Sequence, residues 1–61
     1  MDEKKAKFQV GDNVVFIRDR EIYEVVTVKP YEYGFISGFR YDLQGNLPLV
    51  DILEDELVKK K

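Results

Sequence analysis

The chain has 61 residues, of which 36% are charged and 13% aromatic, and its formal net charge is −2. It contains no cysteine and no histidine, which excludes disulfides, zinc–thiolate centres, thiol nucleophiles and Ser-His-Asp catalysis. A Ser–Lys pair of Ser37 and Lys29 is formally available, but without a pocket signal it does not indicate an enzyme. The composition predicts one small, non-enzymatic domain.

Two strands open the predicted fold. Residues 13–17 form the first, and both of its faces are apolar, which is typical of a bent or doubly covered strand. Residues 21–28 form the second and are rich in β-branched and aromatic side chains. The polar residues 18–20 connect the two strands as a turn.

Proline and glycine punctuate the middle of the chain. Because Pro30 cannot donate to a ladder, we expect it to end the second strand and residues 31–34 to form a loop. Residues 35–43 form the third strand, with a bulge or kink at Gly38. Residues 44–46 read Gln-Gly-Asn, a sequence that tolerates positive φ and predicts a turn.

The C-terminal part predicts a short strand and one helical turn. Residues 47–50 form a fourth strand, which lies at an edge or begins there because it contains a proline. Residues 51–57 are acidic and too short for an independent helix. We expect them to form a single 3₁₀ or α turn with Asp51 as its N-cap and with Leu53 and Leu57 pointing inward.

Five short strands, the last beginning at Val58, predict an all-β fold. The expected architecture is a small five-stranded barrel or strongly bent sheet with one short 3₁₀/α turn before the last strand. A domain of this size buries only about 60% of the surface that its unfolded chain exposes, so its core must use large side chains. The expected core residues are Val14, Val26, Phe35, Phe39, Tyr41 and Leu57.

Three stretches resemble the SH3-like small β-barrels. Residues 8–16, Phe-Gln-Val-Gly-Asp-Asn-Val-Val-Phe, are similar to their opening, in which an apolar residue precedes Gly-Asp-x-Val. Residues 22–28 resemble their second strand, and residues 41–57 resemble their closing hairpin with its acidic helical turn. The resemblance implies an SH3-like barrel over residues 8–58 and, since such barrels serve many binding roles, a binding module.

Two subgroups of these barrels suggest ligands. The KOW-type RNA-binding modules share the Gly-Asp-x-Val start, but they are usually basic and carry a glycine where this chain has residues 18–21. Tudor-like members hold methylated side chains in an aromatic cage. The aromatic residues available for such a cage are Tyr23, Tyr31, Tyr33, Phe35, Phe39 and Tyr41. The chain is also similar to small bacterial and phage proteins.

Charge divides the chain into three segments. Residues 1–7 carry one net positive charge, residues 8–58 carry four basic and ten acidic side chains, and residues 59–61 are all lysine. We expect a flexible charged N-terminus, a barrel and a solvated basic tail. The acidic body disfavours nucleic-acid binding, because that affinity comes largely from basic side chains facing the phosphates. No apolar run has the length of a signal peptide or bilayer span, so we expect a cytoplasmic protein without a membrane partner.

The predicted contact surface lies in two loops. Tyr31 and Tyr33 follow Pro30, and loop tyrosines supply contact area at low entropic cost. Their alternative role is to close the barrel mouth as a lid. Arg18 and Arg20 flank the first turn, where acidic neighbours at positions 19, 21 and 24 are expected to neutralise them.

Arg40 completes the candidate surface at its edge. Its ordinary role is a cross-strand ion pair, and its functional role would be to stack on an aromatic ring or a base. The leading hypothesis is protein or peptide recognition by a monomer or a homodimer, the latter formed through exposed aromatics or a strand edge. The alternative is nucleic-acid binding through Tyr31, Tyr33, Phe39, Arg40 and the lysine tail.

No cofactor or metal is predicted. The C-terminal carboxylates lack the spacing of a Ca²⁺ loop, and helix capping and solubility account for them. These carboxylates are Asp51, Glu54, Asp55 and Glu56.

Overall fold

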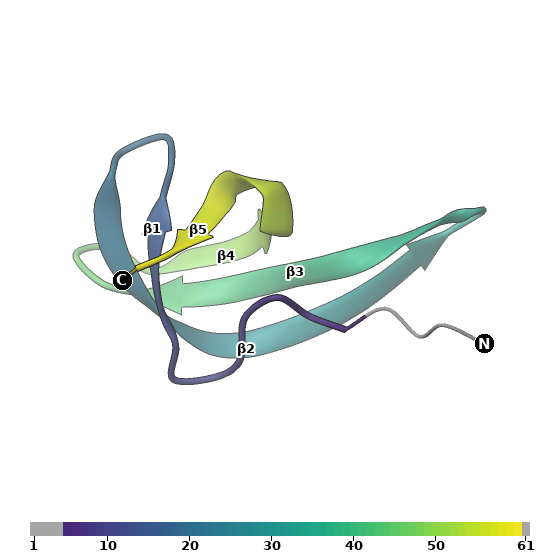
Figure 1. The fold of residues 1–61 in the computed structure, drawn as a ribbon, viewed down its shortest axis with the longest axis horizontal. Helices are drawn as coiled ribbons and strands as arrows, with labels where there is room; N and C mark the ends of the chain where they lie inside the picture. The colour runs from purple at the N-terminus through teal and green to yellow at the C-terminus, as the bar shows by residue number, and fades with distance from the viewer. Residues whose placement is uncertain (1–4, 61) are drawn as a thin grey trace.

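The computed structural model describes residues 5–60, which form one antiparallel sheet of five strands (Figure 1). One short 3₁₀ helix precedes the last strand, so the predicted all-β class and the helical turn are confirmed. The elements are β1 (Asn13–Phe16), β2 (Glu21–Tyr33), β3 (Ile36–Gln44), β4 (Leu49–Leu53), η1 (Glu54–Glu56) and β5 (Leu57–Lys59).

The sheet is bent but not closed. Its strand order is β4-β3-β2-β1-β5, and each neighbouring pair is antiparallel. Within residues 5–60, no ladder joins the end strands β4 and β5, which are connected only through η1. A closed barrel is therefore not formed, although the number of strands matches the prediction; the fourth strand is β4 at Leu49–Leu53 instead of residues 47–50.

The core lies on the concave face of the sheet. Val14 and Leu57 belong to it as predicted, and Tyr41 is fully buried. Val26 instead is 39% exposed, because Tyr23 and Val25 point into the core and strand alternation places Val26 on the outer face, where the register of β2 also shifts. The buried side chains are Phe8, Val14, Tyr23, Val25, Tyr41, Leu43 and Leu57.

The β2–β3 hairpin is much longer than predicted. Pro30 does not end β2, and residues 31–33 continue the strand instead of forming a loop. β1 pairs with β2 only as far as Glu24, so β2 is an edge strand at Pro30. A proline is tolerated there because its nitrogen can face the open edge, where no ladder bond is needed.

Gly38 pairs with Tyr31 in regular register, so the bulge predicted at Gly38 is wrong. A Cβ atom built on Gly38 would lie 2.9 Å from the Tyr31 hydroxyl. Glycine leaves room for the Tyr31 ring, which lies across it.

The acidic segment differs from the prediction at its start. Asp51 lies in β4 with φ of 56°, at a register irregularity, and the N-cap position of η1 is Leu53. The Asp51 backbone N–H donates to Asp42 Oδ1 at 3.1 Å, which fixes this left-handed residue. Leu57 is buried as expected, but Leu53 is 43% exposed at the end of an edge strand.

Residues 1–4 of the predicted flexible N-terminus and Lys61 of the predicted tail lie outside the described residues. The Lys7 backbone N–H donates to Glu54 Oε2 at 3.0 Å, and Lys59 is the last residue of β5. The described part of both segments is therefore attached to the body.

Candidate functional site: the hairpin arm

The distal half of the β2–β3 hairpin projects from the body (Figure 1). We call residues 29–40 the hairpin arm and the remainder of the described chain the base. The molecule measures 37 × 20 × 17 Å, and the arm forms one end of its long axis. No arm residue is buried. The arm is therefore held mainly by its own two strands, and Phe39, expected in the core, is only partly buried where it packs against the core at the root of the arm.

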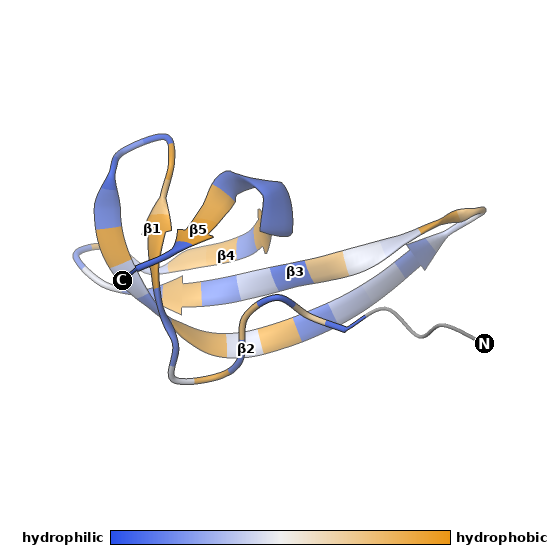
Figure 2. Ribbon diagram, in the orientation of Figure 1, coloured by the Kyte–Doolittle hydropathy of each residue, from blue (hydrophilic) through white to orange (hydrophobic). Residues whose placement is uncertain are grey.

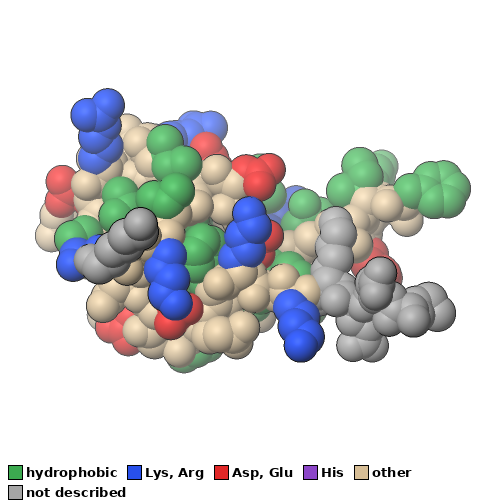
Figure 3. All heavy atoms as spheres, in the orientation of Figure 1, with side chains coloured by type: hydrophobic (Ala, Val, Ile, Leu, Met, Phe, Trp, Pro, Cys, Tyr) green, Lys and Arg blue, Asp and Glu red, His purple; other side chains and the backbone are tan. Residues whose placement is uncertain are grey.

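The arm ends in a cluster of exposed apolar side chains, the tip, formed by Tyr33, Phe35 and Ile36. Tyr33 is 81% exposed, Ile36 is 62% exposed, and Phe35 is fully exposed. Figure 2 shows the hydrophobic turn at the end of the arm, and Figure 3 shows apolar side chains standing out from it. Phe35 is thus not a core residue, contrary to the prediction.

Turn geometry explains the exposure of Phe35. Gly34 has φ of 63°, whereas Phe35 is not among the residues with positive φ. Positive φ at the first central residue alone is the pattern of a type II′ turn, which joins strands through two residues and favours glycine first. The side chain of the second central residue then has no neighbouring strand to pack against.

Tyr31 and Arg40 brace the arm behind the tip. The Arg40 guanidinium lies 4.9 Å from the centroid of the Tyr31 ring, which itself covers Gly38. Among the described residues Arg40 makes no ion pair, so the expected cross-strand pair is not found, and its guanidinium instead stacks on a ring of its own chain. Tyr31 is half-buried and Tyr33 is not, so the two tyrosines do not form a lid over a barrel mouth.

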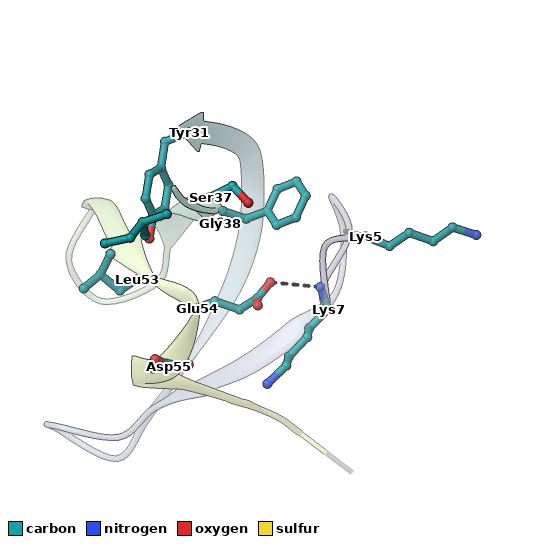
Figure 4. A pocket seen from close by; sticks show the side chains of 10 residues that line it. Lys5, Lys7, Tyr31, Ser37, Gly38, Leu53, Glu54 and Asp55 are labelled. Atoms are coloured by element: carbon teal, nitrogen blue, oxygen red, sulfur yellow. Dashed lines mark hydrogen bonds between the residues drawn. The ribbon is translucent and has the colours of Figure 1, made fainter. Parts of the chain in front are cut away.

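A groove of about 460 Å³ runs along β3 between the tip and the base (Figure 4). β4 ends at Leu53, opposite Arg40, and leaves the groove beside the distal part of β3. Its walls combine apolar side chains with two lysines and two carboxylates. The lining residues are Lys5, Lys7, Tyr31, Ile36, Ser37, Gly38, Phe39, Leu53, Glu54 and Asp55.

A buried hydroxyl fixes the base end of this groove. The Tyr41 hydroxyl donates to Glu54 Oε2 at 2.6 Å and accepts the Phe8 N–H at 3.4 Å. Burial and the adjoining Glu54 carboxylate raise the pKa of Tyr41 to about 12. Glu54 therefore ties the N-terminal segment to the sheet.

Arg18 and Arg20 lie in the β1–β2 turn, at the other end of the molecule from the tip (Figure 1). Arg18 Nε pairs with Glu56 Oε1 at 2.9 Å instead of with the predicted local carboxylates. Arg20 is exposed, with φ of 61°. The predicted surface is therefore divided: Tyr31, Tyr33 and Arg40 come together, and the two turn arginines do not join them.

The β1–β2 turn is held by a second tyrosine. The Tyr23 hydroxyl donates to Asp19 Oδ2 at 2.5 Å, and this bond, with burial, raises the pKa of Tyr23 to about 12. Tyr23 and Tyr41 thus belong to the base while Tyr33 and Phe35 belong to the tip. The aromatics considered for a Tudor-like cage do not converge.

Lys29 lies at the root of the arm in a cluster with two carboxylates. Its Nζ is 2.9 Å from Asp42 Oδ1 and 3.1 Å from Asp51 Oδ1. These bonds raise the pKa of Lys29, and the Lys29 ammonium lowers the pKa of Asp42. Lys29 is thus held as a cation, the opposite of what a base for Ser37 would need.

Within residues 5–60, no group of three or more carboxylate, imidazole or thiolate ligands is arranged for a metal ion. The same residues contain no helix with the length and hydrophobicity needed to cross a bilayer.

Sequence reasoning missed two of the three tip residues, Phe35 and Ile36. The available signal was Gly34-Phe35 between β-forming residues, which predicts a two-residue hairpin turn. This signal was hidden by the expectation that Pro30 ends the strand and that residues 31–34 form a loop.

No family model, curated protein or solved structure matches the chain.

Proposed function

We propose that this chain is a non-enzymatic binding module that recognises a protein through its hairpin arm. The observation that carries the proposal is the exposed tip of Tyr33, Phe35 and Ile36. Fully burying one such side chain is worth about 1.5–3 kcal/mol. Three of them on one projection form an anchor of the kind that dominates protein interfaces.

The composition of the arm supports a protein over a nucleic acid as its partner. The arm carries one acidic side chain, Glu32, and two basic ones, Lys29 and Arg40, of which Lys29 is already paired with Asp42 and Asp51. Phosphate binding draws its affinity from cations. The one arginine of the arm, Arg40, is already stacked on Tyr31, and Phe39 alternates with Arg40 onto the opposite face of β3. The arm therefore lacks the basic stacking platform that a single strand would need.

The strand order and the 3₁₀ helix before β5 support kinship with the SH3-like small barrels. In this proposal the sheet is an open relative of those barrels. The elongated β2–β3 hairpin supplies the contact surface in place of the loops expected from the sequence.

The proposal is tested by affinity capture from cells that express the protein, followed by quantitative mass spectrometry. Tagged wild type is compared with Phe35→Ser and Tyr33→Ser. Val50→Ser is the matched control, because Val50 is 65% exposed but lies on β4, outside the arm. We expect both tip variants to lose a protein that wild type and the control retain. An identical set of captured proteins for all four chains would refute the proposal.

A second measurement addresses the nucleic-acid alternative. Fluorescence anisotropy of a labelled single-stranded oligonucleotide at low salt should show no binding. Binding that weakens steeply as salt increases would favour the alternative instead.

A further inference from the structure

The tip and the groove adjoin each other on the same arm. The tip has apolar side chains and no cavity, and the groove has a cavity lined partly by apolar side chains, among them Phe39 and Leu53. Ile36 belongs to both, so the two features form one continuous surface along β3. One copy of the chain therefore carries both an apolar projection, the tip, and a groove in which apolar side chains can be received.

Twofold symmetry would bring these two features together. In an isologous dimer the same patch faces itself, so each contact between two different sites occurs twice. If two arms lie antiparallel about an axis near the middle of the distal part of β3, the tip of each copy reaches the groove of the other. Phe35 of one copy then meets Leu53 of its partner.

The groove has room for such a contact. Its volume of about 460 Å³ falls within the range of sites that enclose small organic molecules, which is ~300–1,000 Å³. An aromatic side chain buries about 150–250 Å². Two per copy give about 600–1,000 Å² for a dimer before the groove walls they cover are counted, so the total reaches the ~1,200 Å² of a stable interface.

Charge is compatible with this arrangement. The tip residues 33–36 are uncharged, so two tips can approach without repulsion. The acidic side chain nearest to the tip in the chain is the exposed Glu32, and the groove that would receive the tip is rimmed by Lys5 and Lys7. The groove also carries Glu54 and Asp55, at the end of the groove that lies against the base.

We infer that the partner of the arm is a second copy of this chain, in a dimer whose arms lie antiparallel with each tip in the other copy's groove. This inference rests on the proposed function and names its partner.

The oligomeric state tests it. Analytical ultracentrifugation of the wild-type chain over a concentration series should show a monomer–dimer equilibrium. Phe35→Ser in the tip and Leu53→Ser in the groove should each weaken the dimer by more than about tenfold, the loss expected for an interface anchor. Val50→Ser should leave the dimer unchanged. Circular dichroism of each variant checks that it is folded.

A mixing experiment shows whether tip and groove meet. In a heterodimer of Phe35→Ser with Leu53→Ser, one tip–groove contact carries both changes and the other is intact. Mixing the two variants should therefore restore part of the association that each lacks alone. No recovery on mixing, or a wild-type dimer that both variants leave intact, would overturn the inference.

The outcomes separate the two proposals. A wild-type chain that stays monomeric at its highest soluble concentration overturns the dimer alone, since the arm can still bind a different protein. Affinity capture that is insensitive to the tip overturns the proposed function. If both are right, the tagged chain captures untagged copies of itself, and the tip variants do not.

Discussion

The strands β2 and β3 run through both the base and the hairpin arm, but most of their large apolar side chains are buried in the base and exposed in the arm. In the base, β2 and β3 bury Tyr23, Val25, Tyr41 and Leu43. In the arm no residue is fully buried, and Tyr33, Phe35 and Ile36 at its end are exposed. A two-stranded ribbon alone is marginally stable in water, so the arm depends on its attachment to the base. Stability and contact surface are therefore separated along one hairpin.

Both regions also place a tyrosine ring over a glycine, with different consequences. In the base, a Cβ atom on Gly45 would lie 2.6 Å from the buried Tyr23 ring. In the arm, a Cβ atom on Gly38 would meet the Tyr31 ring at its hydroxyl end. The Tyr23 ring is enclosed by the core, whereas the partly exposed Tyr31 ring has room to move.

The largest expected difference between the regions is that between Tyr41→Ala and Tyr33→Ala. Removing a buried aromatic ring costs about 3–5 kcal/mol, whereas an exposed one changes stability by no more than about 0.5 kcal/mol. A domain of this length has roughly 3–9 kcal/mol in total, so Tyr41→Ala should be largely unfolded at room temperature. Urea denaturation followed by circular dichroism measures both. Equal losses for the two variants would mean that the arm packs on the base in solution.

The glycine pair gives the next effect. Gly45→Ala should destabilise the fold by about 1–3 kcal/mol because the Tyr23 ring cannot yield. Gly38→Ala should cost less than about 1 kcal/mol, because the far end of the Tyr31 side chain can shift. Thermal unfolding compares the two variants. A larger loss for Gly38→Ala would show that Tyr31 is held more firmly than its partial exposure suggests.

The two buried tyrosines of the base should make the fold sensitive to alkali. The pKa values of Tyr23 and Tyr41 rise from 10.0 in the unfolded chain to about 12 in the fold. Their contribution is therefore fully present below about pH 10 and is lost as the pH rises through about 12. Unfolding free energies measured from pH 8 to 12 should fall over that window. Tyr41→Phe should fall less steeply with pH, and a slope equal to that of wild type would contradict the assignment.

The smallest effect belongs to the brace of the arm. Arg40→Gln removes a cation–π contact worth about 0.5–1 kcal/mol at an exposed site. Global stability should therefore barely change, whereas amide hydrogen exchange in residues 29–40 should quicken relative to the base. Unchanged exchange in the arm would show that the Tyr31–Arg40 contact does not order it.

Local pattern predicted a large part of the base. The strands at residues 13–16 and 21–28, the turn after Gln44, the 3₁₀ helix and the burial of Val14, Tyr41 and Leu57 follow from alternation, turn chemistry and residue type. These features depend on neighbours in the sequence. The candidate site was predicted only in part: Tyr31, Tyr33 and Arg40 were identified, but Arg18 and Arg20 lie elsewhere.

Errors arose where the decisive contact was distant in sequence. Whether Pro30 ends a strand depends on the length of β1, and the partner of Arg18 is Glu56, 38 positions away. The exposure of Phe35 depends on where the hairpin leaves the body. A local window contains none of this information.

The sequence by itself determined an all-β chain with tightly spaced turns, because side-chain alternation and the φ preferences of glycine and proline act within a few residues. Only the tertiary structure decided that the sheet stays open, that β2 extends beyond its pairing with β1, and that the three large apolar side chains of the tip are exposed to solvent. Those outcomes depend on relative strand lengths and registers, which are set by pairing between distant segments.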